Sequence, residues 1–254
     1  MLAEERKEAI LKMLEEEGSV KVSKLTKLFD VSIETIRRHL EALEKEGALK
    51  RVYGGAVLKR SEVQNLNYIS REKEFIDEKK EIANTAIKYI EEGQSVALND
   101  STTNIELARA LKKNFKRLTV ITNSLLIANE LVDAENFTVI CTGGMLHQRE
   151  RAFYGNLAEN LLSNFIVNKA FISVSGVSLI RGITDFLPEE VQIQRKLIEI
   201  AQETIILADS SKIDTVSLMK VEDIHEINLI ITDSKLDLKI LNKYLKNGIE
   251  IVSE

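Results

Sequence analysis

Apolar residues recur with the period of an α-helix in three successive segments near the start of the chain. The first segment runs from Arg6 to Glu16, the second starts with Ser23 as its N-cap, and the third starts with Ser32 as its N-cap. The residues predicted to face inward are Ile10, Leu11 and Leu14, then Leu25, Leu28 and Phe29, then Ile33, Ile36, Leu40 and Leu43. Asp30-Val31 makes a tight turn before the third helix, and Gly47 ends it. This order predicts a helix-turn-helix.

A basic hairpin is predicted to follow the third helix. Gly54-Gly55 supplies a turn in which positive φ is allowed, and the surrounding positive charges suit phosphate oxygens. These charges are Lys50, Arg51, Lys59 and Arg60. On the third helix, Arg37 and Arg38 point away from the apolar stripe, as arginines that bind guanine in a major groove do. An isolated arginine pair is usually only a solvated helix face, but here the context predicts a DNA-binding winged helix-turn-helix.

Beyond Gly93, short apolar runs alternate with amphipathic stretches. The predicted strands are Ser95–Leu98, Leu118–Ile121, Thr138–Cys141, Lys169–Val174, Thr204–Ala208, Leu229–Ile231 and Ile249–Val252. The predicted helices between them are Asn104–Lys113, Ser124–Val132, Pro188–Gln202 and Asp237–Leu245. This alternation predicts a mostly parallel α/β sheet. The predicted organisation is a winged helix-turn-helix over 1–57, a polar linker over 58–69, and an α/β domain over 70–254 whose first helix runs from Ser70 to Gly93.

Small polar residues and glycines follow four of the predicted strands. They are Asn99 to Asn104, Thr122 to Ser124, Thr142 to Gly144, and Asp209 to Lys212. Ligands of open α/β sheets bind beyond the carboxyl ends of the strands, where helix N-termini present free N–H groups to anions. At any single loop such residues are usually only caps and turns. Four such loops in one domain favour a shared polar crevice suited to phosphate and sugar oxygens.

Charge is distributed unevenly along the chain. Residues 1–60 carry 13 Lys and Arg against 11 Asp and Glu, and the remainder carries 22 against 29, for a net charge of −5. Local basic clusters, and not the net charge, must therefore supply affinity for phosphate.

Several classes of protein are disfavoured by the composition. No apolar run is long enough for a transmembrane helix, and the first residues lack the apolar region of a signal peptide. The single cysteine, Cys141, is interpreted as a buried strand thiol, as expected in a reducing cytoplasm. The three histidines, His39, His147 and His225, lack metal-ligand spacing. We therefore expect a cytoplasmic protein with no metal and no cofactor.

The segment Ser32-Ile33-Glu34-Thr35-Ile36-Arg37-Arg38, with Arg51-Val52-Tyr53-Gly54-Gly55-Ala56, resembles the N-terminal signature of DeoR-type bacterial regulators of sugar metabolism. The family string ends Arg-Arg-Asp-Leu, and here His39 replaces the Asp. The resemblance implies binding to double-stranded operator DNA. The residues predicted to contact DNA are Ser32, Glu34, Thr35, Arg37, Arg38, His39, Lys50, Arg51, Tyr53 and Gly54.

The polar loops of the second domain resemble the sensor domain of the same family, which is similar in fold to ribose-5-phosphate isomerase and glucosamine-6-phosphate deaminase. Asn99 and Ser101 replace an Asp and a Gly of the family pattern, and Asn168 replaces a frequent Asp. The resemblance implies that a phosphorylated sugar binds this domain, with its phosphate on residues 101–103. The predicted effector-binding residues are Asp100, Ser101, Thr102, Thr103, Asn123, Ser124, Gly143, Gly144, Arg149 and Lys212.

Two functions of different classes fit these features. The first is a transcriptional repressor of a carbohydrate-utilisation operon, relieved by a phosphorylated sugar and assembled as a dimer or tetramer. The second is a sugar-phosphate isomerase or deaminase that carries a DNA-binding module. An enzyme needs a positioned base, and the candidates Asp185, Glu189 and Glu190 are equally explained as acidic residues at a helix start. We expect the repressor, with no catalytic residues. The sugar, the operator, the regulated genes and the choice between dimer and tetramer stay open.

Overall fold

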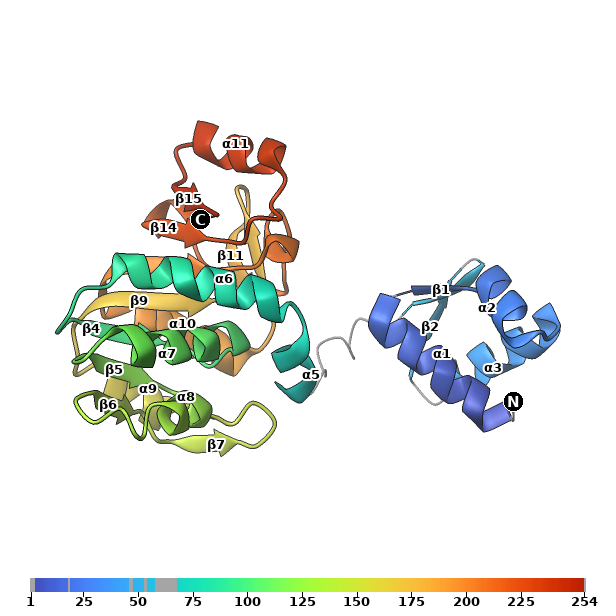
Figure 1. Cartoon of the computed structure of the whole chain (residues 1–254), viewed down its shortest axis with the longest axis horizontal. Coiled ribbons are helices and arrows are strands. Elements are labelled where there is room, and N and C mark those ends of the chain that lie inside the picture. The colour runs from blue at the N-terminus through green and yellow to red at the C-terminus, as the bar shows by residue number, and fades with distance from the viewer. Residues whose placement is uncertain (1–2, 18, 46–47, 53, 58–67, 254) are drawn as a thin grey trace. The chain divides into compact units, whose positions relative to one another are not determined.

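The computed structural model describes residues 3–17, 19–45, 48–52, 54–57 and 68–253. The chain divides into two compact units, residues 1–66 and 67–254, and each is described here by itself (Figure 1). Of the predicted linker, residues 58–67 lie outside the described residues, and the last two positions belong to a helix.

The first unit consists of three helices and a small antiparallel sheet. Its elements in chain order are α1 (Ala3–Glu17), β1 (Ser19–Lys21), α2 (Val22–Phe29), α3 (Ile33–Lys45), β2 (Lys50–Val52) and β3 (Gly55–Val57). The strand order is β1-β3-β2. Asp30 joins α2 to α3 in the left-handed conformation, with φ of 50°, which Asp tolerates better than most residues. The predicted winged helix-turn-helix is therefore confirmed, with β1 as an additional strand.

Most of the predicted inward-facing residues of this unit are buried. Ile10, Leu14, Leu25, Ile36, Leu40 and Leu43 form its core. Two details of the prediction are wrong, and a third falls on a residue that the structure does not describe. The N-cap position of α2 is Lys21 and makes no side-chain cap, so Ser23 lies inside the helix. Leu28 is 58% exposed and Ile33 is 55% exposed, because the buried faces of these helices centre on other residues. Gly47, predicted to end α3, lies outside the described residues.

The second unit is built on a seven-stranded sheet in which every pair of neighbours is parallel. Its strands, from one edge to the other, are β15 (Ile251–Val252), β14 (Leu229–Ile231), β12 (Ala201–Leu207), β9 (Val167–Ser173), β4 (Ser95–Leu98), β5 (Thr119–Thr122) and β6 (Thr138–Cys141). All seven strands coincide with predicted ones to within a few residues. The predicted parallel α/β fold is confirmed.

Helices cover both faces of this sheet, so alternate residues of its strands enter two different cores. On one face, Val96, Leu98 and Phe171 pack against α6 (Ile76–Ala86), α7 (Thr102–Asn114) and α8 (Leu125–Glu130). On the other face, Ala97 and Ile172 pack against α9 (Asn156–Leu162), α10 (Pro188–Glu199) and α11 (Leu238–Lys246). Figure 1 shows α6 and α7 lying across the sheet. Strands that are buried on both faces explain why their sequences read as continuous apolar runs.

The chain enters the sheet at its centre. From β4 it moves outward to β5 and β6, and it then returns to β9 on the other side of β4. The point at which the winding direction reverses lies between β4 and β9, and the crevice at such a point is the usual ligand site of an open α/β sheet.

Three features of the second unit did not follow from the sequence pattern. The helix expected from Ser70 to Gly93 is broken at Phe75, whose φ is 51°, into α5 (Tyr68–Lys73) and α6, followed by a short 3-10 turn. A hairpin forms from β7 (Met145–His147) and β8 (Ala152–Tyr154). An antiparallel sheet forms from β10 (Gly176–Ser178), β11 (Gly182–Asp185) and β13 (Met219–Glu222).

Candidate functional sites

The N-terminal end of α3 is capped and carries two exposed arginines. The Thr35 amide donates to Ser32 Oγ at 3.2 Å, and the hydroxyl oxygens of Ser32 and Thr35 lie 2.9 Å apart. Ser32 is therefore the N-cap of α3, as predicted. Arg37 and Arg38 are both exposed, as is Glu34. The cap fixes the start of α3, so these side chains project in a defined direction. Contacts with base edges in the major groove require such a direction.

His39, predicted among the DNA-contacting residues, lies on the inner side of α3. Its side chain is only 8% exposed, and Arg6 Nε donates to its Nε2 at 3.2 Å. His39 is one turn of helix from the core residues Ile36 and Leu43, which explains its burial. It therefore joins α3 to α1 and does not share the exposed face with Arg37.

A groove separates α3 from the wing. Its volume is about 640 Å³, and its lining residues are Val22, Arg37, Leu40, Glu44, Arg51, Gly54 and Gly55. The backbone N–H and the Nε of Arg51 both donate to the Glu44 carboxylate, at 2.8 and 2.7 Å. Arg51 would have to exchange this carboxylate for a DNA phosphate. Of the other predicted contacts, Gly54 forms the turn with φ of 81°, while Tyr53 and the side chain of Lys50 lie outside the described residues.

In the second unit, the polar residues that follow β4 form hydrogen bonds with the residue after β5 on one side and with the end of β9 on the other. Asn123 Nδ2 donates to Asp100 Oδ1 at 2.6 Å, and the Asp100 amide donates to Asn123 Oδ1 at 3.0 Å. The hydroxyl of Tyr154 donates to the other oxygen of Asp100. Asn99 exchanges hydrogen bonds with the backbone of Ser173, at 3.0 and 2.8 Å, and so joins β4 to β9.

Two hydroxyl residues of these loops cap helices. Ser101 Oγ accepts from the Asn104 amide at 2.9 Å and caps α7, and Ser124 Oγ accepts from the Ile127 amide at 3.3 Å and caps α8. Thr103 is buried, whereas Thr102 is half-buried at the first position of α7. The hydroxyls of Ser101 and Ser124 therefore hold the loops in shape.

Gly143, Gly144 and Arg149 belong to a different part of this edge. A Cβ on Gly144 would lie 3.1 Å from the carbonyl oxygen of Tyr154 and 3.3 Å from the amide of Ala158, and both glycines have positive φ. Close approach of the backbone to β8 and α9 explains Gly144 without a ligand. Arg149 is exposed in the loop between β7 and β8.

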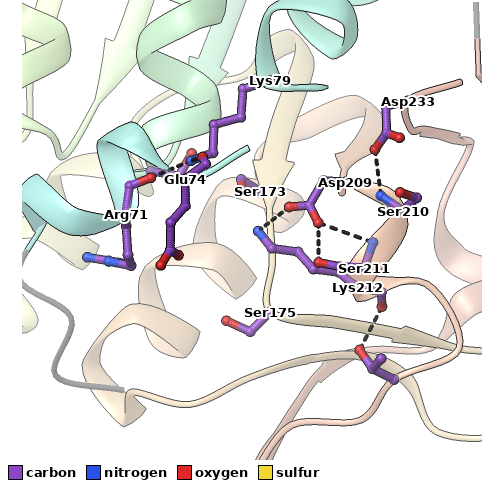
Figure 2. Close-up of polar contacts among 12 residues, drawn as sticks. Arg71, Glu74, Lys79, Ser173, Ser175, Asp209, Ser210, Ser211, Lys212 and Asp233 are labelled. Carbon is purple, nitrogen blue, oxygen red and sulfur yellow. Dashed lines mark hydrogen bonds and ion pairs between the residues drawn. The ribbon is translucent and has the colours of Figure 1, made fainter. Parts of the chain in front are cut away.

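Lys79, a cation that the sequence analysis did not select, lies near the predicted Lys212 (Figure 2). Lys79 is 4% exposed, and its ammonium group donates to the carbonyl oxygens of Arg71 and Glu74, the latter at 2.5 Å. Burial, and then the charge of Lys212, lower the pKa of Lys79 to about 8. Lys212 Nζ lies 3.5 Å from Asp209 Oδ2, and Arg71 forms an ion pair with Glu150. The only sequence signal for Lys79 was a lysine on the apolar side of a helix.

Buried carboxyl groups are a second feature of this part of the unit. Burial raises the pKa of Asp100 to about 7, against the opposing effect of the hydrogen bonds from Tyr154 and Asn123. Burial, and then the negative charges of Asp185 and Asp100, raise the pKa of Glu190 well above its ordinary value. Asp185 instead accepts hydrogen bonds from Ser175 and Gln194, both at 2.7 Å. Among the cations, Arg71 interacts electrostatically with both Asp100 and Glu190.

The free energy of unfolding is expected to fall as the pH rises from 5 to 8, and Asp100→Asn is expected to reduce this fall. The pKa of Asp100 is raised from 3.8 in the unfolded chain to about 7, so its contribution to stability is complete below 3.8 and is lost as the pH rises through 7. The difference between the two proteins is on the order of a few kcal/mol across this range. Urea unfolding followed by circular dichroism measures it, and parallel pH profiles would contradict the assignment.

Two absences concern only the residues that the structure describes. Among them, no three His, Cys, Asp or Glu side chains are placed to hold a metal ion. None of the helices found in those ranges has the length and apolar character needed to cross a membrane.

Comparison with known proteins matches both units. A family model described as the DeoR-like helix-turn-helix domain matches residues 6–62, and one described as the DeoR C terminal sensor domain matches residues 74–234. YulB, an uncharacterized HTH-type transcriptional regulator of Bacillus subtilis, is 39% identical over 237 residues, which cover 93% of this chain and 91% of the relative.

Two further relatives carry more specific names. The HTH-type transcriptional repressor GlcR of Bacillus subtilis is 35% identical and covers 99% of this chain and 96% of its own length. A putative aga operon transcriptional repressor of Escherichia coli O157:H7 is 34% identical and covers 98% and 93%. Among solved structures, ribose 5 phosphate isomerase A of Neisseria gonorrhoeae matches 53% of this chain and 52% of its own, with a TM-score of 0.40 and 13% identity.

Proposed function

The chain belongs to the DeoR family of DNA-binding transcriptional regulators, and we propose that it represses a carbohydrate-utilisation operon until a phosphorylated sugar binds the crevice of its second unit. The observation that carries this proposal is the meeting of Lys79 with Lys212, which follows β12, the neighbour of β9 in the sheet. Two relatives are named as transcriptional repressors, which supports repression of transcription and not activation.

The cationic side of the crevice suits a phosphate group. Among the described contacts, the Lys79 ammonium donates to two carbonyl oxygens, which leaves one of its three protons for a ligand. Lys212 adds a second positive charge next to it, and a phosphate dianion would relieve the repulsion that lowers the Lys79 pKa. The N–H groups that begin α7 at Thr102 supply further donors.

The carboxyl side of the crevice suits sugar hydroxyls. A carboxyl group that keeps its proton near neutral pH donates a hydrogen bond without repelling a nearby phosphate. Glu190 has a raised pKa and can present a neutral carboxyl group to a hydroxyl, whereas both oxygens of Asp100 already accept hydrogen bonds from Asn123 and Tyr154. A phosphorylated sugar therefore complements both sides of the crevice, whereas a free sugar complements one.

Helix α5 is the element through which we propose that binding reaches the DNA-binding unit. It is the first described element after residues 58–67, which join the two units. Lys79 binds the Arg71 carbonyl of this helix, so a ligand that draws the ammonium toward itself alters how the end of α5 is held. Two arrangements of α5 are in equilibrium in this proposal, and the ligand shifts this equilibrium only if it binds one arrangement more tightly than the other. A tenfold loss of operator affinity requires about 1.4 kcal/mol of such coupling.

A thermal-shift screen of sugar phosphates, each beside its unphosphorylated sugar, tests this function. We expect stabilisation by a phosphorylated sugar only, followed by release of an operator that was selected from random duplexes with the same protein. Thr102→Val and Lys212→Ala are expected to abolish both responses. Equal stabilisation by the free sugar, or a ligand response unaffected by both substitutions, would contradict the proposal.

Three further expectations belong to this proposal. We expect no turnover of the sugar phosphates that bind, and analysis of the same mixtures for isomerised or deaminated products tests the enzyme alternative. Symmetric operator half-sites need at least a dimer, so we expect a homo-oligomer, measurable by sedimentation. The protein then works in the cytoplasm, together with its DNA.

A further inference from the structure

Ile33 is an apolar residue that the structure removes from the core of the first unit. It occupies the first position of α3, where the helical pattern predicts an inward direction, yet it is 55% exposed. The core of this unit is completed by Ile36, Leu40 and Leu43 of the same helix. Ile33 therefore contributes little to packing within the unit, and its side chain is available to another molecule.

The surroundings of Ile33 are those of a DNA-reading surface. Arg37 lies one helical turn further along on the same strip, because residues four apart are neighbours on a helix, and it lines the groove toward the wing. Ser32 and Thr35 flank Ile33 with hydroxyls that bond to each other at 2.9 Å. In helix-turn-helix proteins the N-terminal residues of the recognition helix are the ones that contact base edges.

We propose that Ile33 reads a thymine, by packing its side chain against the C5-methyl group in the major groove next to the base bound by Arg37. An exposed isoleucine cannot hydrogen-bond, and the methyl group of thymine is the apolar feature that the major groove offers. The flanking cations, Arg37 and Arg38, favour DNA over an apolar protein surface as the occupant. This inference rests on DNA binding by the first unit and assigns to Ile33 one position of base specificity.

Replacement of single thymines by deoxyuridine tests the contact, because deoxyuridine lacks only the methyl group. The full-length protein first selects its operator from random duplexes, and each thymine of that operator is then replaced in turn. We expect one position in each half-site at which deoxyuridine weakens binding about fourfold, the equivalent of about 0.8 kcal/mol for one buried methyl-sized group. In Ile33→Ala, binding to the unmodified operator is expected to be weaker by a similar or larger factor, and deoxyuridine at that position is expected to cause no further loss.

Leu28→Ala is the matched control, because Leu28 is a similarly exposed apolar residue in the same unit. This variant is expected to keep the deoxyuridine sensitivity of the natural protein. Thermal unfolding of Ile33→Ala is expected to be close to that of the natural protein, since the side chain is outside the core.

Three results would overturn the proposal. The first is an operator that tolerates deoxyuridine at every thymine, and the second is an effect of deoxyuridine that persists in Ile33→Ala. The third is a change of oligomeric state in Ile33→Ala with unchanged deoxyuridine sensitivity, which would identify a second copy of the chain as the occupant. Failure to select any duplex would instead contradict DNA binding itself, so the two failures are distinguishable.

Discussion

Arg37→Ala and Arg38→Ala are each expected to weaken operator binding by about 1–3 kcal/mol, or roughly five- to 150-fold, and to relax the sequence preference. Both side chains are exposed on the helix that Ser32 caps, and neither is needed for the core. A bidentate contact between arginine and guanine is lost completely when the guanidinium is removed. Fluorescence anisotropy with the selected operator and with single-base variants measures both the affinity and the preference.

Two controls separate base reading from charge in this experiment. Lys45→Ala removes a positive charge from the last turn of the same helix, where Lys45 pairs with Glu41 at 3.0 Å, and should change affinity little. Lys50→Ala should weaken all sequences alike and reduce the salt dependence by about one unit of slope. Unchanged operator affinity and preference in both arginine variants would show that α3 is not the recognition helix.

Lys79→Met is expected to lower effector affinity by at least tenfold. The substitution removes a buried ammonium group that we assign to the phosphate, and a charge-assisted hydrogen bond contributes about 1.5–3 kcal/mol. Because the pKa of Lys79 is about 8, effector affinity of the natural protein should fall as the pH rises through 8, and this fall should disappear in the variant. Titration calorimetry with the sugar phosphate found in the screen measures both effects.

Lys80→Met is the matched control for this substitution. Lys80 is the next residue of α6, is exposed, and lines a shallow groove with α7. Its loss should leave both the affinity and its pH dependence unchanged. Since Lys79 also binds two carbonyl oxygens, Lys79→Met is expected to unfold at a somewhat lower temperature, and Lys212→Ala provides a second variant that keeps those contacts. Effector affinity that is unchanged in Lys79→Met and in Lys212→Ala would place the phosphate elsewhere.

The sequence by itself determined the elements whose pattern is local. The apolar runs at Ser95–Leu98, Thr138–Cys141 and Leu229–Ile231 are strands with those same bounds. Leu229–Ile231 is buried along its whole length, as expected of an inner strand of a parallel sheet, whereas Thr138–Cys141 is an edge strand and is only partly buried. The cap at Ser32 and the left-handed turn at Asp30 also follow from local chemistry, since side-chain caps and turn conformations depend on a few adjacent residues. From parallel strands alone, the loops after β4 and β5 could be expected at one edge, and Asp100 indeed meets Asn123 there.

Only the tertiary structure decided which residues of a helix face inward and which distant residues meet. Ile33 was predicted to face inward and is exposed, whereas His39 was predicted to face the DNA and is buried. The helical period predicts that one side of α3 is buried, but only the packing of the unit's core determines which residues at the margin of that side are covered. Lys79 of α6 lies near Lys212, although the two lysines are 133 positions apart in the sequence. Such a meeting of distant side chains depends on strand order and helix packing, which no local pattern contains.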